Sequence, residues 1–431
     1  MIAQTKRFVY TENMNNFPRV FLKSKEETEI QQGFPWCFNN EISHIKYRNS
    51  ERDEWQLKSL EEAAIKNGTI IELYTKAGGF LGTGIFNKNS KITVRIISGE
   101  HADKVVENTQ LFWEKRICDA ANIRRLKYSE NDSYRLVFAE ADFIPGFICE
   151  RYCDENKKVI LVVQFLAMAC EVFRSEILSA LKKCCSPNAI YERDDADVRK
   201  KEGLEEKTGW LLGSGKTLIT IVENDIKLNV DIANGQKTGY FLDQKDNRKT
   251  AKTFCHGKKV LDTFTHTGAF GLNAFKAGAK QVVSVDISSE AVEMVNKNIA
   301  LNSAQNNMKA VCADVFDLLK NYESSGEKFD VIILDPPAFT KSAKAIQKAY
   351  GGYKEINLRA MRLLNSGGIL ITCSCSYFFD EHYFYDMLMH AAMDSHRRVQ
   401  ILEKRGAGMD HPVLLGYPKS EYLKCAICRV M

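Results

Sequence analysis

The segment spanning residues 259–271 limits most strongly what this chain can fold into, because its pattern changes from strand to helix across a short polar loop. Residues 259–264 form an apolar run typical of a buried strand, and apolar spacing resumes at residues 269–277 with the period of a helix. A second strand-like run, residues 281–286, follows and ends on Asp286. The sequence therefore predicts a strand, a tight loop, a helix and another strand.

The acidic end of the second strand indicates a nucleoside ligand. Asp286 lies about 20 residues after the loop, where a carboxylate can hold the two hydroxyls of a ribose. Dinucleotide-binding loops need several glycines so that the backbone can approach a pyrophosphate, whereas this loop offers one suitable glycine, Gly268. An adenosine without phosphates, as in S-adenosylmethionine, therefore fits better than a dinucleotide.

Length and composition predict a folded protein of several domains. The 431 residues suffice for about three domains, and the chain is 45% apolar and 27% charged. No apolar run reaches the ~18 residues of a membrane span and no secretory signal is present, so we expect a cytoplasmic protein. In that reducing compartment the 13 cysteines are expected to be free thiols, and no metal site is expected at Cys425 and Cys428.

The succession of elements predicts three domains and a multidomain α/β fold. Residues 18–98 read as short strands separated by glycines and polar turns, which is typical of a small β-barrel. Residues 99–230 read as a connecting helix followed by a mixed α+β domain. Residues 231–431 alternate strands and helices, which predicts a Rossmann-like parallel sheet covered on both faces. Its strands are expected near residues 260–264, 282–286, 310–315, 331–335 and 369–374.

Polar residues follow these strands where their carboxyl ends should meet. Ligands of such sheets bind outside the carboxyl ends of the strands, so these residues are expected to converge. They are Asp262 to Gly268, Asp286, Asp314, Asp335 and Cys373 to Ser376. Pro336 and Pro337 follow Asp335 directly and hold the backbone rigid where it passes a flat substrate.

Cys375 and Asp335 suggest a specific chemistry at neighbouring strand ends. Carbon-5 of a pyrimidine is a poor nucleophile until a thiolate adds to carbon-6, and a group near nitrogen-3 must steady the developing charge. Cys375 can supply the thiolate and Asp335 the second group. The alternative is that Cys373 and Cys375 are small core residues, since free cysteines are often buried.

Several motifs taken together resemble a known family. The motifs are residues 235–248, 262–271, 285–286, 314–316, 335–339, 352–357, 374–376 and 410–412, together with residues 133–136 and 197–203. In this order they resemble the bacterial 23S ribosomal RNA cytosine carbon-5 methyltransferases of the RlmI type, over roughly residues 18–431. Residues 18–23 and 33–38 resemble the opening of a PUA domain, an RNA-binding barrel. The resemblance implies a PUA domain, a central domain and a class I methyltransferase domain that uses S-adenosylmethionine.

The resemblance also implies roles for individual residues. Cys375 matches the nucleophile and Asp335 its catalytic partner, although Cys373, two residues away, is expected on the same face of the strand. The implied cofactor-binding residues are Thr265, Thr267 and Gly268 at the methionine part, Asp286 at the ribose, Asp314 and Val315 at the adenine, and Arg248 and Gln244 at the cofactor carboxylate, with Phe264 and Ile287 as further contacts. For Arg248 and Gln244, structural support of the domain junction is the alternative.

The implied partner is 23S ribosomal RNA or a large-subunit precursor, with a homodimer left open. The basic segments 124–127 and 199–201 are expected either to grip phosphates or to be solvated charge runs. Ala338 leaves no second cysteine after Pro336 and Pro337, so product release must use another base. Two alternatives to cytidine methylation stay open: methylation of a guanine nitrogen, which needs no cysteine, and an RNA-binding assembly factor with a vestigial catalytic domain.

Overall fold

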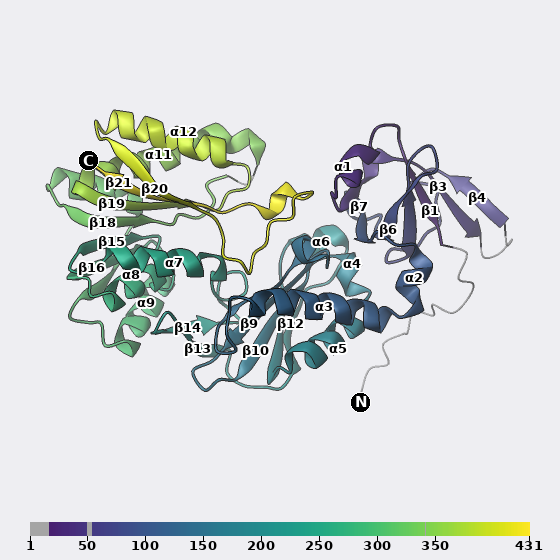
Figure 1. Cartoon of the computed structure of the whole chain (residues 1–431), viewed down its shortest axis with the longest axis horizontal. Coiled ribbons are helices and arrows are strands. Elements are labelled where there is room, and N and C mark those ends of the chain that lie inside the picture. The colour runs from purple at the N-terminus through teal and green to yellow at the C-terminus, as the bar shows by residue number, and fades with distance from the viewer. Residues whose placement is uncertain (1–16, 50–53, 341) are drawn as a thin grey trace.

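The computed structural model describes residues 17–49, 54–340 and 342–431, which form four β-sheets with their covering helices (Figure 1). The sheets follow one another along the chain, with seven, five, two and seven strands. The predicted division at residues 98/99 and 230/231 stays a prediction, which limited proteolysis would test.

The first sheet is the purple unit of Figure 1 and has the strand order β2-β7-β6-β5-β1-β3-β4. Its elements are β1 (Arg19–Leu22), α1 (Glu27–Gln31), β2 (Trp36–Phe38), β3 (Ile42–Asn49), β4 (Glu54–Lys58), β5 (Ile70–Tyr74), β6 (Phe80–Phe86) and β7 (Ile92–Ser98). Alternate residues of the strands, such as Val20, Leu73 and Val94, are buried in one core. The short strands predicted from the sequence are confirmed, while β3 and β4 were not predicted.

A five-stranded sheet with the order β12-β11-β10-β9-β8 forms the middle of the molecule. The helices α2 (Ala102–Glu107) and α3 (Thr109–Arg125) lead into it. Its other elements are β8 (Tyr134–Phe138), β9 (Phe147–Cys153), β10 (Val159–Phe165), α4 (Met168–Glu171), α5 (Arg174–Cys185), β11 (Ala189–Asp194), α6 (Val198–Glu202) and β12 (Lys207–Leu212).

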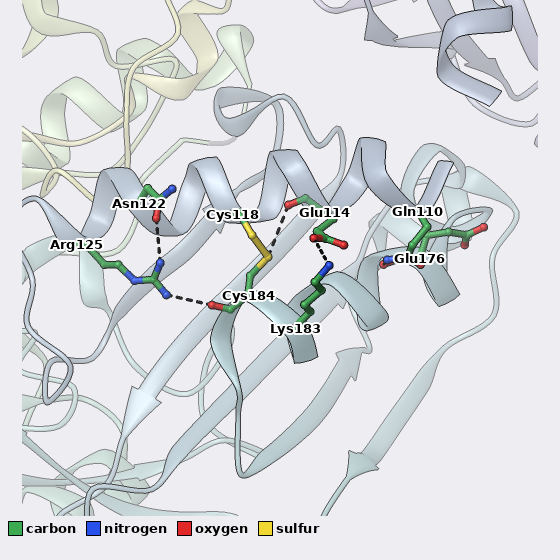
Figure 2. Close-up of a disulfide and its surroundings, with 8 residues drawn as sticks. All are labelled: Gln110, Glu114, Cys118, Asn122, Arg125, Glu176, Lys183 and Cys184. Atoms are coloured by element: carbon green, nitrogen blue, oxygen red, sulfur yellow. Dashed lines mark hydrogen bonds and ion pairs between the residues drawn. A yellow bond between two sulfur atoms is a disulfide. The ribbon is translucent and has the colours of Figure 1, made fainter. Parts of the chain in front are cut away.

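One disulfide corrects the prediction that all cysteines are free thiols. Cys118 on α3 and Cys184 at the end of α5 are bonded, at a sequence separation of 66 (Figure 2). Beside the bond, Lys183 pairs with Glu114 at 2.6 Å and so also joins the two helices. The spacing of the cysteines could not reveal this pair, because only the packing of α3 on α5 brings them together. The other eleven cysteines are free.

The last sheet has the strand order β17-β16-β15-β18-β19-β21-β20. Its strands are β15 (Lys259–Thr263), β16 (Gln281–Asp286), β17 (Met308–Cys312), β18 (Phe329–Leu334), β19 (Leu364–Ser374), β20 (Val399–Arg405) and β21 (Lys424–Val430). Five strands are parallel as predicted, but β21 runs antiparallel to β19 and β20 antiparallel to β21, so the sheet is mixed. The strand expected at residues 310–315 ends at Cys312.

Helices cover both faces of this sheet. They are α7 (Lys245–Ala251), α8 (Ala269–Lys276), α9 (Ser289–Leu301), α10 (Val315–Ser324), α11 (Ile346–Leu363) and α12 (Glu381–Asp394). Consecutive strand residues enter different cores: Val260 packs in one and Leu261 in the other. Both faces of a buried parallel strand must be apolar, which explains the continuous apolar runs in the sequence. The hairpin of β13 (Leu218–Glu223) and β14 (Ile226–Asp231) shares the first of these cores.

The basic segments predicted as phosphate grips are partly structural. Arg124 is fully buried and donates to both oxygens of Asp142 and to the backbone oxygen of Asp410, at 2.5–2.7 Å. Arg199 is likewise buried and pairs with Asp194 at 2.9 Å. These two arginines therefore hold the fold together, because each also donates to a backbone oxygen that is distant in the sequence, Arg124 to Asp410 and Arg199 to Phe165.

The segment between β20 and β21 extends from the last sheet to the first (Figure 1). Gly416 lies so close to Gly33 that an added Cβ would be 2.7 Å from the Gly33 Cα. The ammonium of Lys419 lies 4.4 Å from the centre of the Trp36 ring. No helix within the described part of the chain is long and apolar enough to span a membrane.

Candidate active site

A cavity of about 600 Å³ lies outside the carboxyl ends of β15, β16, β18 and β19. The strand order reverses between β15 and β18, and ligands of open α/β sheets bind where the order reverses. Seven of the predicted site residues line the cavity: Gln244, Phe264, Thr267, Asp286, Ile287, Asp335 and Cys375. The predicted convergence of the strand ends is therefore observed for four strands.

The loop between β15 and α8 is built around the buried carboxylate of Asp262. Its Oδ2 accepts hydrogen bonds from the hydroxyl of Thr265, from the backbone N–H of Gly271 at 2.9 Å and from the hydroxyl of Ser284 at 3.0 Å. Thr265, predicted to line the cofactor site, thus serves to hold the loop. Gly268 precedes α8 with a φ of +81°, where a side chain would be strained and would crowd Val295.

The same loop presents groups to Asp286. Phe264 and His266 adopt left-handed φ values of 56° and 53°, which are uncommon for residues other than glycine and often occur at functional sites. This conformation lets the His266 N–H donate to one oxygen of Asp286 at 2.9 Å, while the Ser288 N–H donates to the other at 3.1 Å. The carboxylate is thereby fixed at the cavity wall with lone pairs left for a ligand.

Asp335 is held at the end of β18 by Gln244. The side-chain N–H of Gln244 donates to Asp335 Oδ1 at 2.8 Å, and its oxygen accepts from Asn247 at 2.7 Å. Burial raises the pKa of Asp335 to about 7, and the nearby charge of Asp243 acts in the same direction. A carboxyl group with this pKa can both donate and accept a proton near neutral pH.

Cys375 lines the cavity, whereas Cys373 does not. Cys373 is fully buried in the core and is paired across the strands with Cys425. The expectation that both cysteines share a face is wrong, because β19 ends at Ser374 and the alternation of a strand no longer applies to Cys375. Burial and, to a smaller extent, the charge of Asp335 raise the pKa of the Cys375 thiol to about 11, against an opposing effect of Lys237.

Four further predicted residues lie outside the cavity lining besides Thr265: Gly268, Asp314, Val315 and Arg248. The carboxylate of Asp314 caps α10 by accepting from the Phe316 N–H at 2.7 Å, and Val315 is buried in the core. Arg248 donates to both oxygens of Glu223, at 2.6 and 2.9 Å, and to the backbone oxygen of Phe241. These contacts favour the structural alternative for Arg248.

Sequence reasoning missed several cavity residues, among them Lys237, Phe241, Asp243 and His266. Lys237, Phe241 and Asp243 belong to the motif of residues 235–248, where the glycines of residues 235 and 239 were the signal of a tight loop. The hydroxyl of Tyr422 donates to Asp243 Oδ2 at 2.5 Å. Burial alone would raise the pKa of Asp243, but Lys237, His411 and this hydrogen bond lower it to about 2.

The cavity suits S-adenosylmethionine. Among the described residues, Asp243 Oδ1 is buried without a hydrogen-bond partner, which leaves an acceptor for the α-ammonium group of a methionine moiety. Asp286 offers a carboxylate to a ribose, and Ile287, with 68% of its surface exposed, offers an apolar wall to an adenine. The donors and acceptors therefore match a nucleoside joined to an amino acid.

Comparisons with known proteins indicate the same cofactor. A family model of S-adenosylmethionine-dependent methyltransferases matches residues 176–406, and a model of PUA-like domains matches residues 20–99. The chain is 39% identical over 415 residues to ribosomal RNA large subunit methyltransferase I of Photobacterium profundum, covering 95% of this chain and 99% of the relative. It is 37% identical over 424 residues to the protein of the same name from Aeromonas hydrophila, covering 95% and 98%.

Solved structures share the fold. A Streptococcus mutans protein assigned to the S-adenosylmethionine-dependent methyltransferases matches with a TM-score of 0.76 at 21% identity, over 95% of this chain and 99% of that chain. A methyltransferase solved with S-adenosylhomocysteine matches with the same values. The predicted multidomain α/β fold with a PUA-like and a methyltransferase domain is thus confirmed, as is the cofactor. The chain belongs to the ribosomal RNA large subunit methyltransferase I family of S-adenosylmethionine-dependent enzymes.

Proposed function

We propose that this protein methylates carbon-5 of a cytidine in 23S ribosomal RNA through a covalent adduct with Cys375. The observation that carries the proposal is that Cys375 and Asp335 line one cavity, at the ends of adjacent strands. The names of the relatives support a large-subunit ribosomal RNA as the substrate.

The chemistry follows from these two side chains. The Cys375 thiolate adds to carbon-6 of the cytosine, while the carboxyl of Asp335 donates its proton at nitrogen-3 and so prevents a full negative charge on the ring. The electron pair released to carbon-5 can then attack a methyl group. A base takes the proton of carbon-5, the bond between sulfur and carbon-6 breaks, the thiolate leaves, and nitrogen-3 returns its proton to the carboxylate of Asp335. Because Ala338 follows Pro337, this base is not a second cysteine.

Bound S-adenosylmethionine supplies the methyl group as a sulfonium electrophile. We assign its ribose to Asp286, its adenine to Ile287 and its methionine part to Phe264 and Thr267, because these residues line the cavity beside Cys375. Asp314, Val315, Thr265 and Gly268 then act indirectly by shaping the loops. Gln244 keeps the Asp335 carboxyl oriented toward the base.

The target cytidine must be unpaired or turned out of its helix, since a stacked base cannot enter a cavity at strand ends. A bacterial ribosomal RNA is found in the cytoplasm, and the proposal places the protein there.

The test uses ribosomal RNA from a strain that lacks this gene, incubated with the protein and the cofactor and then analysed by nucleoside mass spectrometry. We expect 5-methylcytidine with the natural protein and with Cys312→Ala, whose exposed cysteine is the matched control. Cys375→Ala should form none. Methylguanosine formed by both variants would establish the guanine alternative, and cofactor binding without any product would establish the assembly factor.

A trapping experiment tests the adduct itself. RNA that contains 5-fluorocytidine cannot lose fluorine to a base, so methylated RNA should stay bonded to the Cys375 sulfur and migrate with the protein in denaturing gels. Cys375→Ser should abolish the bonded species, while Cys373→Ser should retain it. A species of equal yield without the Cys375 sulfur would disprove the covalent step.

A further inference from the structure

Lys237 brings an ammonium group to a cavity whose wall is otherwise acidic. Five carboxylates line this cavity: Asp231, Asp243, Asp286, Glu290 and Asp335. Among the described residues that line it, Lys237 is the one lysine or arginine. A thiolate formed at Cys375 would therefore face mostly like charges, and a cation on the same wall is the group that could offset them.

The loop that carries Lys237 is closed tightly by two glycines. A Cβ added to Gly235 would lie 2.8 Å from the Gly239 Cα and 2.5 Å from the backbone oxygen of Asp231. Lys237 lies between the glycines with a left-handed φ of 53°. This conformation costs a residue other than glycine roughly 1 kcal/mol, and such strain is often found at functional sites.

The ammonium of Lys237 is not held in an ion pair in the described structure, although its charge also helps to lower the pKa of Asp243. No hydrogen bond or ion pair of its ammonium is found among the described residues, and it lies over the rings of Phe241 and Tyr422, at 4.7 and 6.0 Å from their centres. Lys424, the other lysine near Cys375, donates to the backbone oxygens of Ser376 and Tyr422 at 2.6 and 2.8 Å. Lys424 thus fixes the loop after Cys375, while Lys237 is available for charge stabilisation.

We propose that Lys237 is a positioning residue that acts through Cys375, its ammonium group stabilising the thiolate form of the nucleophile. The inference rests on the proposed function and adds the group that makes the sulfur reactive. The thiol proton goes to solvent, and no bond to Lys237 forms or breaks.

Four charged groups face Cys375 from the surrounding elements: Asp335 from β18, Asp243 from η3 (Leu242–Gln244), Lys424 from β21 and Lys237. The two acids raise the pKa of the thiol, in addition to burial, and Lys237 lowers it. When Asp335 carries the proton that it donates to the base, one of the opposing charges is gone. Lys237 would then stabilise the thiolate at the stage where it attacks.

The test measures the charge state of the Cys375 sulfur directly. Iodoacetamide alkylates thiolates, so the rate at Cys375, followed by peptide mass spectrometry over a range of pH, reports its pKa, with exposed Cys312 in the same molecule as reference. The variants are Lys237→Asn, since asparagine tolerates a left-handed φ, and Lys237→Arg, which keeps the charge. Lys216→Asn removes a loop lysine that is also exposed but lies outside the cavity, and is the matched control.

We expect Lys237→Asn to alkylate Cys375 about three- to tenfold more slowly near pH 8, with the pH profile displaced upward, as removal of a partly screened opposite charge predicts. Lys237→Arg should lie within about twofold of the natural protein, and Lys216→Asn should equal it. A Lys237→Asn profile that coincides with the natural one overturns the inference. So does an equal loss in Lys237→Arg, which would assign Lys237 to the loop structure alone.

Failure of the proposed function would look different. If Cys375→Ala methylated RNA normally, the covalent mechanism would be wrong whatever the alkylation profiles of the Lys237 variants. If Cys375→Ala were inactive and the alkylation profiles coincided, only the role of Lys237 would be wrong.

Discussion

Replacing Arg248 by methionine would leave the carboxylate of Glu223 buried without its cation. The two side chains are buried, with 2% and 3% of their surfaces exposed, and two hydrogen bonds of 2.6 and 2.9 Å join them. Removing one partner of a buried ion pair costs about 3–5 kcal/mol, because the remaining charge stays desolvated. For a unit of about 200 residues this corresponds to a melting temperature lower by roughly 10 °C, measured by scanning calorimetry.

A second substitution separates the lost pair from the stranded charge. Glu223→Gln in the Arg248→Met background removes the buried charge and keeps an oxygen for the hydroxyl of Tyr240, which donates to Glu223 at 3.1 Å. We expect the double variant to recover more than half of the lost stability. A double variant as unstable as Arg248→Met would refute the reasoning, since the cost would then not come from the unpaired carboxylate.

The same variants decide between the two roles predicted for Arg248. If the residue only supports the junction, the double variant should bind S-adenosylmethionine within about threefold of the natural protein in calorimetric titrations. If Arg248 held the cofactor carboxylate, affinity would fall about tenfold or more with or without the Glu223 substitution, as for a lost hydrogen bond between charged groups.

Three further predictions follow from the site and its supports. Gly271→Ala should lower the free energy of unfolding by about 1–3 kcal/mol and weaken cofactor binding, because its Cβ would lie 2.3 Å from the Ser284 Oγ. As a control, an added Cβ at Gly351 would meet no atom within 4 Å, so Gly351→Ala should leave the melting temperature unchanged or raise it. Asp335→Asn should increasingly stabilise the protein as the pH rises from about 4 to above 7. Burial raises the pKa of Asp335 to about 7, so ionising this carboxyl in the folded state costs about 2–4 kcal/mol, and asparagine avoids that cost. A stability gain that does not depend on pH in calorimetric scans would contradict this. Cys118→Ser, or reduction of the disulfide, should lower the free energy of unfolding by about 4 kcal/mol, as for a closed loop of 66 residues. A melting temperature that does not change with reductant would show that the bond does not stabilise the packing of α3 on α5.

The last sheet was largely predictable because its signals are local. The runs at residues 260–264, 282–286 and 331–335 are mostly apolar because helices cover both faces of these strands. Asp286 and Asp335 stand at the carboxyl ends of two of these runs, so the sequence alone could place both acids at the same edge of the sheet. The strand β20 and the antiparallel direction of β21 escaped prediction, because the direction of a strand depends on its pairing and not on its own residues.

Which charged and sulfur-containing side chains do chemistry was less predictable. Arg124 and Arg248 read as ligand-binding cations in sequence, yet each meets a buried carboxylate, Asp142 or Glu223, that is distant along the chain. Lys237 lies among the same kinds of residues and makes no such pair in the described structure. The sequence does not tell a lysine or arginine that is paired with a buried carboxylate from one that can contact a ligand, because only the fold brings the carboxylate into contact with the cation.

The sequence by itself determined the order of strands and helices, the nucleoside loop and the acid that ends each of two strands, because periodicity and turn residues act over a few positions. Only the tertiary structure decided that Cys375 lines the cavity while Cys373 packs in the core, that Cys118 is bonded to Cys184, and that Lys237 lines the same cavity as Cys375. These outcomes depend on where a strand stops and on which distant element packs against it, and both are properties of the assembled sheet and helices.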